Sequence, residues 1–153
     1  MLMLTACDKD HEMAYYLDGI WNGQIRDNYD AYDVTMEFIQ SNGFSRSGYG
    51  YEEDCSWSGH LSRARFDWTV RDQCIYLHYS DGTSYVMECS YFPRYAREGE
   101  NFRGTIYNER TKEDVADFYL YKRFNHDDRS NETDSVVVID NKPNVELKES
   151  ELK

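Results

Sequence analysis

The sequence is poor in positive charge, and this shortage excludes one class of partners. Lysine and arginine together number 17, against 29 aspartates and glutamates, so the net charge is −12. Nucleic-acid phosphates and anionic lipid head groups are bound by clusters of Lys and Arg. We therefore expect no nucleic-acid partner and no membrane contact that depends on positive charge.

Long apolar runs and the common helix formers are also scarce. No stretch approaches the roughly 18 consecutive apolar residues that a membrane-spanning helix needs. Leu and Ala are few, whereas aromatic residues are abundant, with 14 Tyr, 7 Phe and 3 Trp. Aromatic and β-branched residues favour strands. A chain of 153 residues suits one domain, so composition predicts a single all-β domain.

Motifs for common catalytic and cofactor sites are missing as well. The chain has no Gly-x-Ser-x-Gly, no His-Glu-x-x-His, no phosphate loop and no Cys-x-x-Cys. We expect no cofactor and no metal. The acidic stretches 8–12 and 126–128 are interpreted as solvated segments. Glu52-Glu53-Asp54 is interpreted as a solvated loop, because three adjacent acids supply too few oxygens for calcium.

Alternation of apolar and polar residues, the strand period, covers most of the chain. It predicts eight strands, at 19–26, 32–40, 44–52, 62–70, 73–80, 83–92, 101–108 and 114–124. Short turns between them, such as Asp81-Gly82, indicate an antiparallel up-and-down order. Closing the sheet removes its two unpaired edges. We expect an all-β, eight-stranded antiparallel barrel over 17–124, with inward side chains including Phe38, Phe66, Trp68 and Phe118.

The composition changes after the last predicted strand. Residues 125–153 are polar and acidic and contain no aromatic residue, which predicts a disordered tail. Val136-Val137-Val138-Ile139 is the exception, long enough for an added strand or a docking segment.

The N-terminus carries a possible lipid-attachment site. Leu4-Thr5-Ala6-Cys7 resembles a bacterial lipobox, the sequence that precedes a lipidated cysteine. A signal peptide needs a basic start and an apolar core, and only six residues precede Cys7. We therefore interpret 1–16 as a remnant signal peptide, a lipidation site at Cys7 and a polar tether. The alternative is an ordinary buried cysteine in a short N-terminal strand.

A family resemblance enters at the first and last strands. Gly19-Ile20-Trp21 matches the Gly-x-Trp of lipocalins, and Lys122 and Arg123 end the last strand. The chain resembles the small lipocalin-like lipoproteins of Gram-negative gut anaerobes. The resemblance implies that Trp21 plugs one end of the barrel beneath Lys122 or Arg123, a cation–π contact. It also implies a lipid-anchored outer-membrane protein, and the acidic residues after Cys7 resemble the signal that sends some such lipoproteins to the cell surface.

Cysteine pairing depends on the turn at Asp81-Gly82. A two-residue turn places Cys74 opposite Cys89, a candidate disulfide in an oxidising compartment. A three-residue turn shifts the register by one and separates the two cysteines, and Cys55 is then a possible partner for either. The connectivity stays open.

The functional expectation is a non-enzymatic envelope lipoprotein. Its membrane contact is a lipid on Cys7, and its barrel binds a small apolar or glycan ligand or a surface protein. The tyrosine surplus is either strand filling or a set of exposed rings for sugars or proteins. The alternative is a hydrolase or isomerase at the barrel mouth that uses the loop acids Glu52 or Asp54. A third possibility is a solid barrel that works only through surface contacts.

Overall fold

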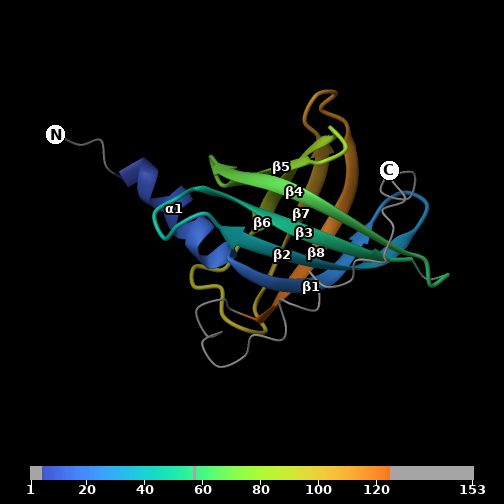
Figure 1. Ribbon diagram of the computed structural model, residues 1–153. Coiled ribbons are helices and arrows are strands. Elements are labelled where there is room, and N and C mark those ends of the chain that lie inside the picture. The colour runs from blue at the N-terminus through green and yellow to red at the C-terminus, as the bar shows by residue number, and fades with distance from the viewer. Residues whose placement is uncertain (1–4, 57, 125–153) are drawn as a thin grey trace.

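A computed structural model describes residues 5–56 and 58–124 (Figure 1). The predicted tail and its docking segment, within 125–153, lie outside these residues.

One helix is followed by a run of antiparallel strands that closes on itself. The elements are α1 (Thr5–Leu17), β1 (Gly19–Arg26), β2 (Ala31–Gln40), β3 (Ser47–Cys55), β4 (Leu61–Arg71), β5 (Cys74–Tyr79), β6 (Ser84–Tyr91), β7 (Asn101–Asn108) and β8 (Asp114–Phe124). Each strand pairs with the next, and β8 pairs with β1. The predicted eight-stranded up-and-down barrel is confirmed.

Strict alternation on β4 shows how the sequence builds the interior. Every second residue from Ser62 to Val70 is buried, and the residues between them are exposed or half-buried. The large inward rings of Phe66 and Trp68 pack with Phe38, whose ring centroid lies 5.3 Å from that of Phe66. Phe118 is also buried. The four predicted inward residues are therefore all in the core.

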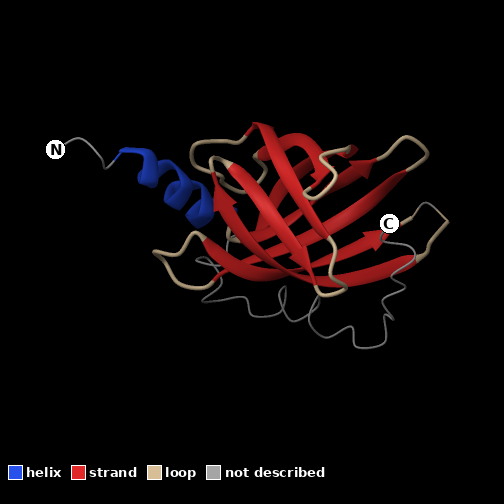
Figure 2. Ribbon diagram, turned by 90° about the horizontal axis from the view of Figure 1, so that it is seen from above, coloured by secondary structure: helices blue, strands red, loops and turns tan. Residues whose placement is uncertain are grey.

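The helix α1 covers one end of the barrel (Figures 1 and 2). Met13, Ala14 and Leu17 share one helical face and are buried. The segment interpreted as a polar tether is thus helical from Thr5, and its second half packs on the strands. No helix in the described residues is long and apolar enough to cross a membrane.

Asp10 fixes the helix to the turn between β4 and β5. Its two carboxylate oxygens accept hydrogen bonds from the backbone N–H groups of Asp72 and Gln73, at 3.0 and 2.9 Å. Both turn residues have positive φ, 52° and 62°, a conformation uncommon outside glycine. The sequence predicts that Asp10 is solvated, whereas in the structure it connects α1 to this strained turn.

The hairpin between β5 and β6 corrects the predicted disulfide. Tyr79 donates its N–H to the carbonyl of Thr83 at 2.9 Å, so the turn is one residue longer than Asp81-Gly82 alone. Cys74 consequently pairs with Glu88 rather than with Cys89. Neighbours along a strand point to opposite faces, which separates the two thiols.

Cys55, Cys74 and Cys89 are free thiols in the structure. Cys89 packs against the core, and burial, the largest cause, raises the pKa of its thiol to about 12. A thiol that stays protonated is a poor nucleophile.

Candidate ligand-binding site

Trp21 closes the end of the barrel nearest α1. Its ring is fully buried and lies edge-on to Phe102, with centroids 4.6 Å apart. The indole N–H donates to the carbonyl of Leu17 at 2.8 Å. The last residue of the helix is therefore tied to the plug, and Gly19, with a φ of 140°, makes the bend between them.

Lys122 is the basic residue over this ring. Its Nζ lies 5.2 Å from the Trp21 ring centroid and donates to the carbonyl of Tyr16 at 2.6 Å. The side chain is only 2% exposed. Arg123, one residue further along the strand, faces solvent. The sequence left open whether Lys122 or Arg123 contacts Trp21, and the structure shows that it is Lys122. The buried side chains of Trp21 and Lys122 occupy the interior at this end of the barrel.

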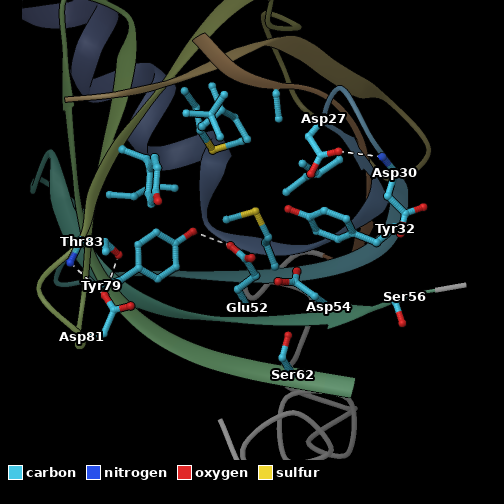
Figure 3. Close-up of a pocket in the computed structure, with 18 of the residues that line it drawn as sticks. Asp27, Asp30, Tyr32, Glu52, Asp54, Ser56, Ser62, Tyr79, Asp81 and Thr83 are labelled. Carbon is cyan, nitrogen blue, oxygen red and sulfur yellow. Dashed lines mark hydrogen bonds between the residues drawn. The ribbon is translucent and has the colours of Figure 1, made fainter. Parts of the chain in front are cut away.

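A cavity of about 390 Å³ opens at the other end, between the turns that join β1 to β2, β3 to β4 and β5 to β6 (Figure 3). Its apolar lining comes from Ile25, Met36, Leu77, Met87, Ile106, Val115 and Ala116. Its polar lining comes from Asp27, Asp30, Tyr32, Glu52, Asp54, Ser56, His60, Ser62, Tyr79, Asp81, Thr83 and Tyr85.

The cavity exists because the inward side chains of β4 are large at the closed end and small near the mouth. From the closed end to the mouth they are Trp68, Phe66, Ala64 and Ser62. In the neighbouring strand β3, Glu52 lies opposite Ala64 and Asp54 opposite Ser62. Two small residues thus leave room for two carboxyl groups inside the barrel.

Glu52 and Asp54 are strand residues, which corrects their predicted place in a solvated loop. The strand β3 runs from Ser47 to Cys55, three residues further than predicted. Period two then turns Glu52 and Asp54 inward and Glu53 outward. Each of the two inward acids is 5% exposed.

Burial governs the protonation of this carboxyl pair. It is the main cause of a raised pKa at Glu52, partly offset by hydrogen bonds from Asp54 and Tyr79. It also raises the pKa of Asp54 well above its usual range, and the neighbouring Glu52 charge and hydrogen bond raise it further. The pair therefore holds a proton more readily than exposed carboxyl groups do.

Tyrosines complete the polar side of the cavity. The Tyr79 hydroxyl donates to Oε1 of Glu52 (Figure 3). Burial, followed by the Glu52 charge, raises the pKa values of Tyr32 and Tyr79, so both phenols stay protonated. Oδ1 of Asp54 is buried with no hydrogen-bond partner among the described residues. A buried acceptor without a donor is costly, by about 1–3 kcal/mol.

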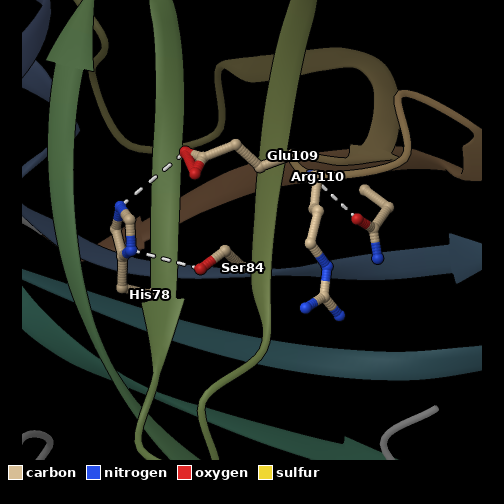
Figure 4. A network of polar contacts seen from close by, with 5 residues as sticks. His78, Ser84, Glu109 and Arg110 are labelled. Carbon is tan, nitrogen blue, oxygen red and sulfur yellow. Dashed lines mark hydrogen bonds and ion pairs between the residues drawn. The ribbon is translucent and has the colours of Figure 1, made fainter.

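A second polar group, on the outer surface, has residue types that suggest a catalytic triad (Figure 4). Nδ1 of His78 lies 3.2 Å from Oγ of Ser84, and its Nε2 lies 3.8 Å from a carboxylate oxygen of Glu109. The His78 side chain is 52% exposed, and none of these residues lines the cavity described above. Nucleophilic catalysis requires a pocket that places the reacting atom, so this group is a surface contact.

Several outward tyrosines are covered by arginines. Arg63 lies over the ring of Tyr51 at 5.5 Å, and Arg65 over that of Tyr49 at 5.3 Å. These cross-strand pairs stabilise the sheet. Part of the tyrosine surplus therefore has a structural explanation.

Sequence reasoning missed Tyr32, Tyr79 and Tyr85 as cavity residues. The decreasing size of the inward residues on β4 is a signal that predicts an opening near Ser62. Among the described residues, no group of three or more His, Cys, Asp or Glu side chains is arranged to hold a metal ion.

Comparisons with known proteins bear on the fold. No family model and no curated protein matches the chain. Among solved structures, the chain is similar to a de novo designed fluorescence-activating β-barrel, with 14% sequence identity and a TM-score of 0.54. The match covers 73% of this chain and 98% of the designed one. At this identity the likeness shows the barrel fold alone.

Proposed function

We propose that this chain is a non-enzymatic, lipid-anchored protein of the cell envelope whose barrel binds one small ligand. The observation that carries the proposal is the cavity of about 390 Å³ at the open end. Binding sites for small molecules are concave, mostly apolar and supplied with a few polar groups. Here Met36, Leu77 and Met87 offer the apolar surface, and Glu52 and Asp54 offer the polar one.

The competing function is a hydrolase or isomerase that uses the same two acids. Its support is their raised pKa values, which are common at catalytic sites. Acid and base in a glycoside hydrolase stand about 5 Å or more apart, on either side of the bond that breaks. Glu52 and Asp54 instead lie against each other on one face of β3, and Oε1 of Glu52 already accepts the Tyr79 hydroxyl. This arrangement favours binding over catalysis.

The fold is compatible with an anchor on Cys7. This residue lies in the first turn of α1, ten residues before Leu17, which corresponds to about 15 Å along a helix. A lipid there would hold the Trp21 end of the barrel toward the bilayer. The cavity would then face away from the membrane, open to a small apolar or glycan ligand or to a partner protein. The resemblance of the chain to lipocalin-like lipoproteins is what suggests this address.

A cavity-filling variant tests the binding function. The probe is N-phenyl-1-naphthylamine, a neutral dye whose emission rises in apolar surroundings. Ala116 lines the cavity, and Ala116→Trp would fill it. Tyr119 lies on the same strand but is 47% exposed, so Tyr119→Trp is the matched control.

We expect saturable binding of one dye per chain. Ala116→Trp should weaken it by about tenfold or more, as loss of ~1.4 kcal/mol would, and Tyr119→Trp should leave it unchanged. Equal affinity in the two variants, or no saturable binding to the native chain, would overturn the proposed function.

A further inference from the structure

The charge of the cavity lining points to one class of ligand. Five of its residues are acids: Asp27, Asp30, Glu52, Asp54 and Asp81. No lysine or arginine is among the described residues that line it. Clefts lined by one sign of charge concentrate ligands of the opposite sign. The cavity therefore disfavours carboxylates and phosphates, and it favours cations.

The two buried acids of the lining, Glu52 and Asp54, offer a hydrogen-bond contact in addition to their negative electrostatic potential. Glu52 and Asp54 lie on one wall, with Tyr32 and Tyr79 beside them (Figure 3). Oδ1 of Asp54 is buried and accepts no hydrogen bond from the described residues. A ligand N–H group would donate a hydrogen bond to this acceptor. A positively charged ligand group would also balance the negative charge of the Glu52–Asp54 pair. Bonds to charged groups contribute about 1.5–3 kcal/mol, against about 0.5–1.5 for neutral ones.

The apolar residues that line the rest of the cavity favour a ligand with a sizeable apolar part. Met36, Leu77, Met87 and Ile106 surround the space next to the carboxyl pair. A fully hydrated inorganic cation gains little from such a surface, whereas a hydrocarbon or aromatic group gains from its burial.

We propose that the ligand is a small apolar molecule with a protonated amine, and that the amine binds the Glu52–Asp54 pair and displaces a proton from it. The proposal rests on the proposed binding function. The exchange balances: the protonated carboxyl of the pair loses its proton to solvent, and its new carboxylate pairs with the ammonium group. No bond other than O–H is broken, and the complex holds one proton fewer than the free partners.

Other titratable groups face the pair and are part of the design of the test. They are Tyr32 on β2, Tyr79 on β5, Tyr85 on β6, Asp27 and Asp30 in the β1–β2 turn, Asp81 in the β5–β6 turn and His60 in the β3–β4 loop. The tyrosines have raised pKa values and stay protonated near neutral pH. A His60→Gln variant removes any contribution of this side chain to the measured proton release.

Three probes of one shape separate the possibilities. They are 2-phenylethylamine, which is a cation at pH 7, its neutral analogue 2-phenylethanol, and the anion 3-phenylpropionate. Titration calorimetry in phosphate and in HEPES, whose ionisation enthalpies differ, counts the protons released. Asp54→Asn removes the exchangeable proton, and Glu53→Gln, one residue away on the outward face, is the matched control for charge.

The amine is expected to bind about tenfold more tightly than the alcohol, the ratio that a difference of ~1.4 kcal/mol gives, and 3-phenylpropionate least of all. Binding of the amine should release close to one proton in the native chain, in His60→Gln and in Glu53→Gln, and close to none in Asp54→Asn. If Asp54→Asn does not fold, proton release in the native chain and in His60→Gln decides the matter.

Equal affinity for the amine and the alcohol, or amine binding without proton release, would overturn the proposal while leaving the binding function intact. If none of the three probes and no neutral dye binds, both the ligand class and the proposed function fail.

Discussion

Replacing Trp21 with alanine is expected to lower the free energy of unfolding by ~3–5 kcal/mol, the range for large aromatic truncations in cores. The ring is fully buried and packs edge-on against Phe102. Its N–H bond to Leu17 adds about 0.5–1.5 kcal/mol. The contact with Lys122 adds about 0.5–2 kcal/mol, depending on desolvation. Packing is thus the largest contribution.

Two further variants separate these contributions. Trp21→Phe keeps an aromatic plug but loses the N–H donor, so we expect a cost of about 1–2 kcal/mol. Lys122→Met keeps an apolar stem, removes the charge and leaves the Tyr16 carbonyl without this donor. Removing a buried charge recovers its desolvation cost, so this variant should lose less stability than Trp21→Ala.

Urea unfolding at pH 7, followed by far-ultraviolet circular dichroism, measures all three variants. A decrease below ~1 kcal/mol for Trp21→Ala would refute the plug, because it would show that the ring contributes little to the core. Equal losses for Trp21→Phe and Trp21→Ala would refute the ranking of packing over the hydrogen bond.

Two other predictions concern the cavity acids and the anchor. Because the pKa values of Glu52 and Asp54 are raised, the folded chain binds more protons than the unfolded chain above pH ~4. The contribution of these two acids to the free energy of unfolding therefore decreases as pH rises, by up to ~1.4 kcal/mol per pH unit for each group. The double variant Glu52→Gln/Asp54→Asn should therefore gain stability relative to the native chain between pH 5 and pH 8 in urea titrations; identical pH dependence would show that both acids are already ionised. Expressed behind a lipoprotein signal peptide in a Gram-negative host, the native protein should incorporate labelled palmitate and Cys7→Ala should not. Similar labelling of both would remove the case for a lipid anchor.

The barrel was predictable because its strands obey a simple rule. On β4 every second residue is inward, and on β8 the inward Phe118 follows the same alternation. A period of two with short turns leaves few other ways to bury these rings. The bounds of β3 were wrong because Glu52-Glu53-Asp54 resembles a solvated loop, although its alternation continues that of Gly50 into the barrel.

Other features depend on geometry that a pattern does not contain. The helix α1 has a narrow apolar face, limited to residues such as Met13 and Leu17, and its packing on the barrel end stabilises it. The register at Cys74 depends on one extra residue in a turn. The cavity depends on the closure of the sheet, which places Glu52 across from the small residue Ala64.

The most direct test of the account is whether a small ligand enters the barrel at the open end. Methionine methyl groups labelled with ¹³C report on both ends, since Met36 and Met87 line the cavity and Met13 is buried on the inner face of α1 at the closed end. Titration with N-phenyl-1-naphthylamine should shift the methyl resonances of Met36 and Met87 and leave that of Met13 in place. Saturating dye that moves Met13 alone, or none of the three, would contradict a binding site in the cavity.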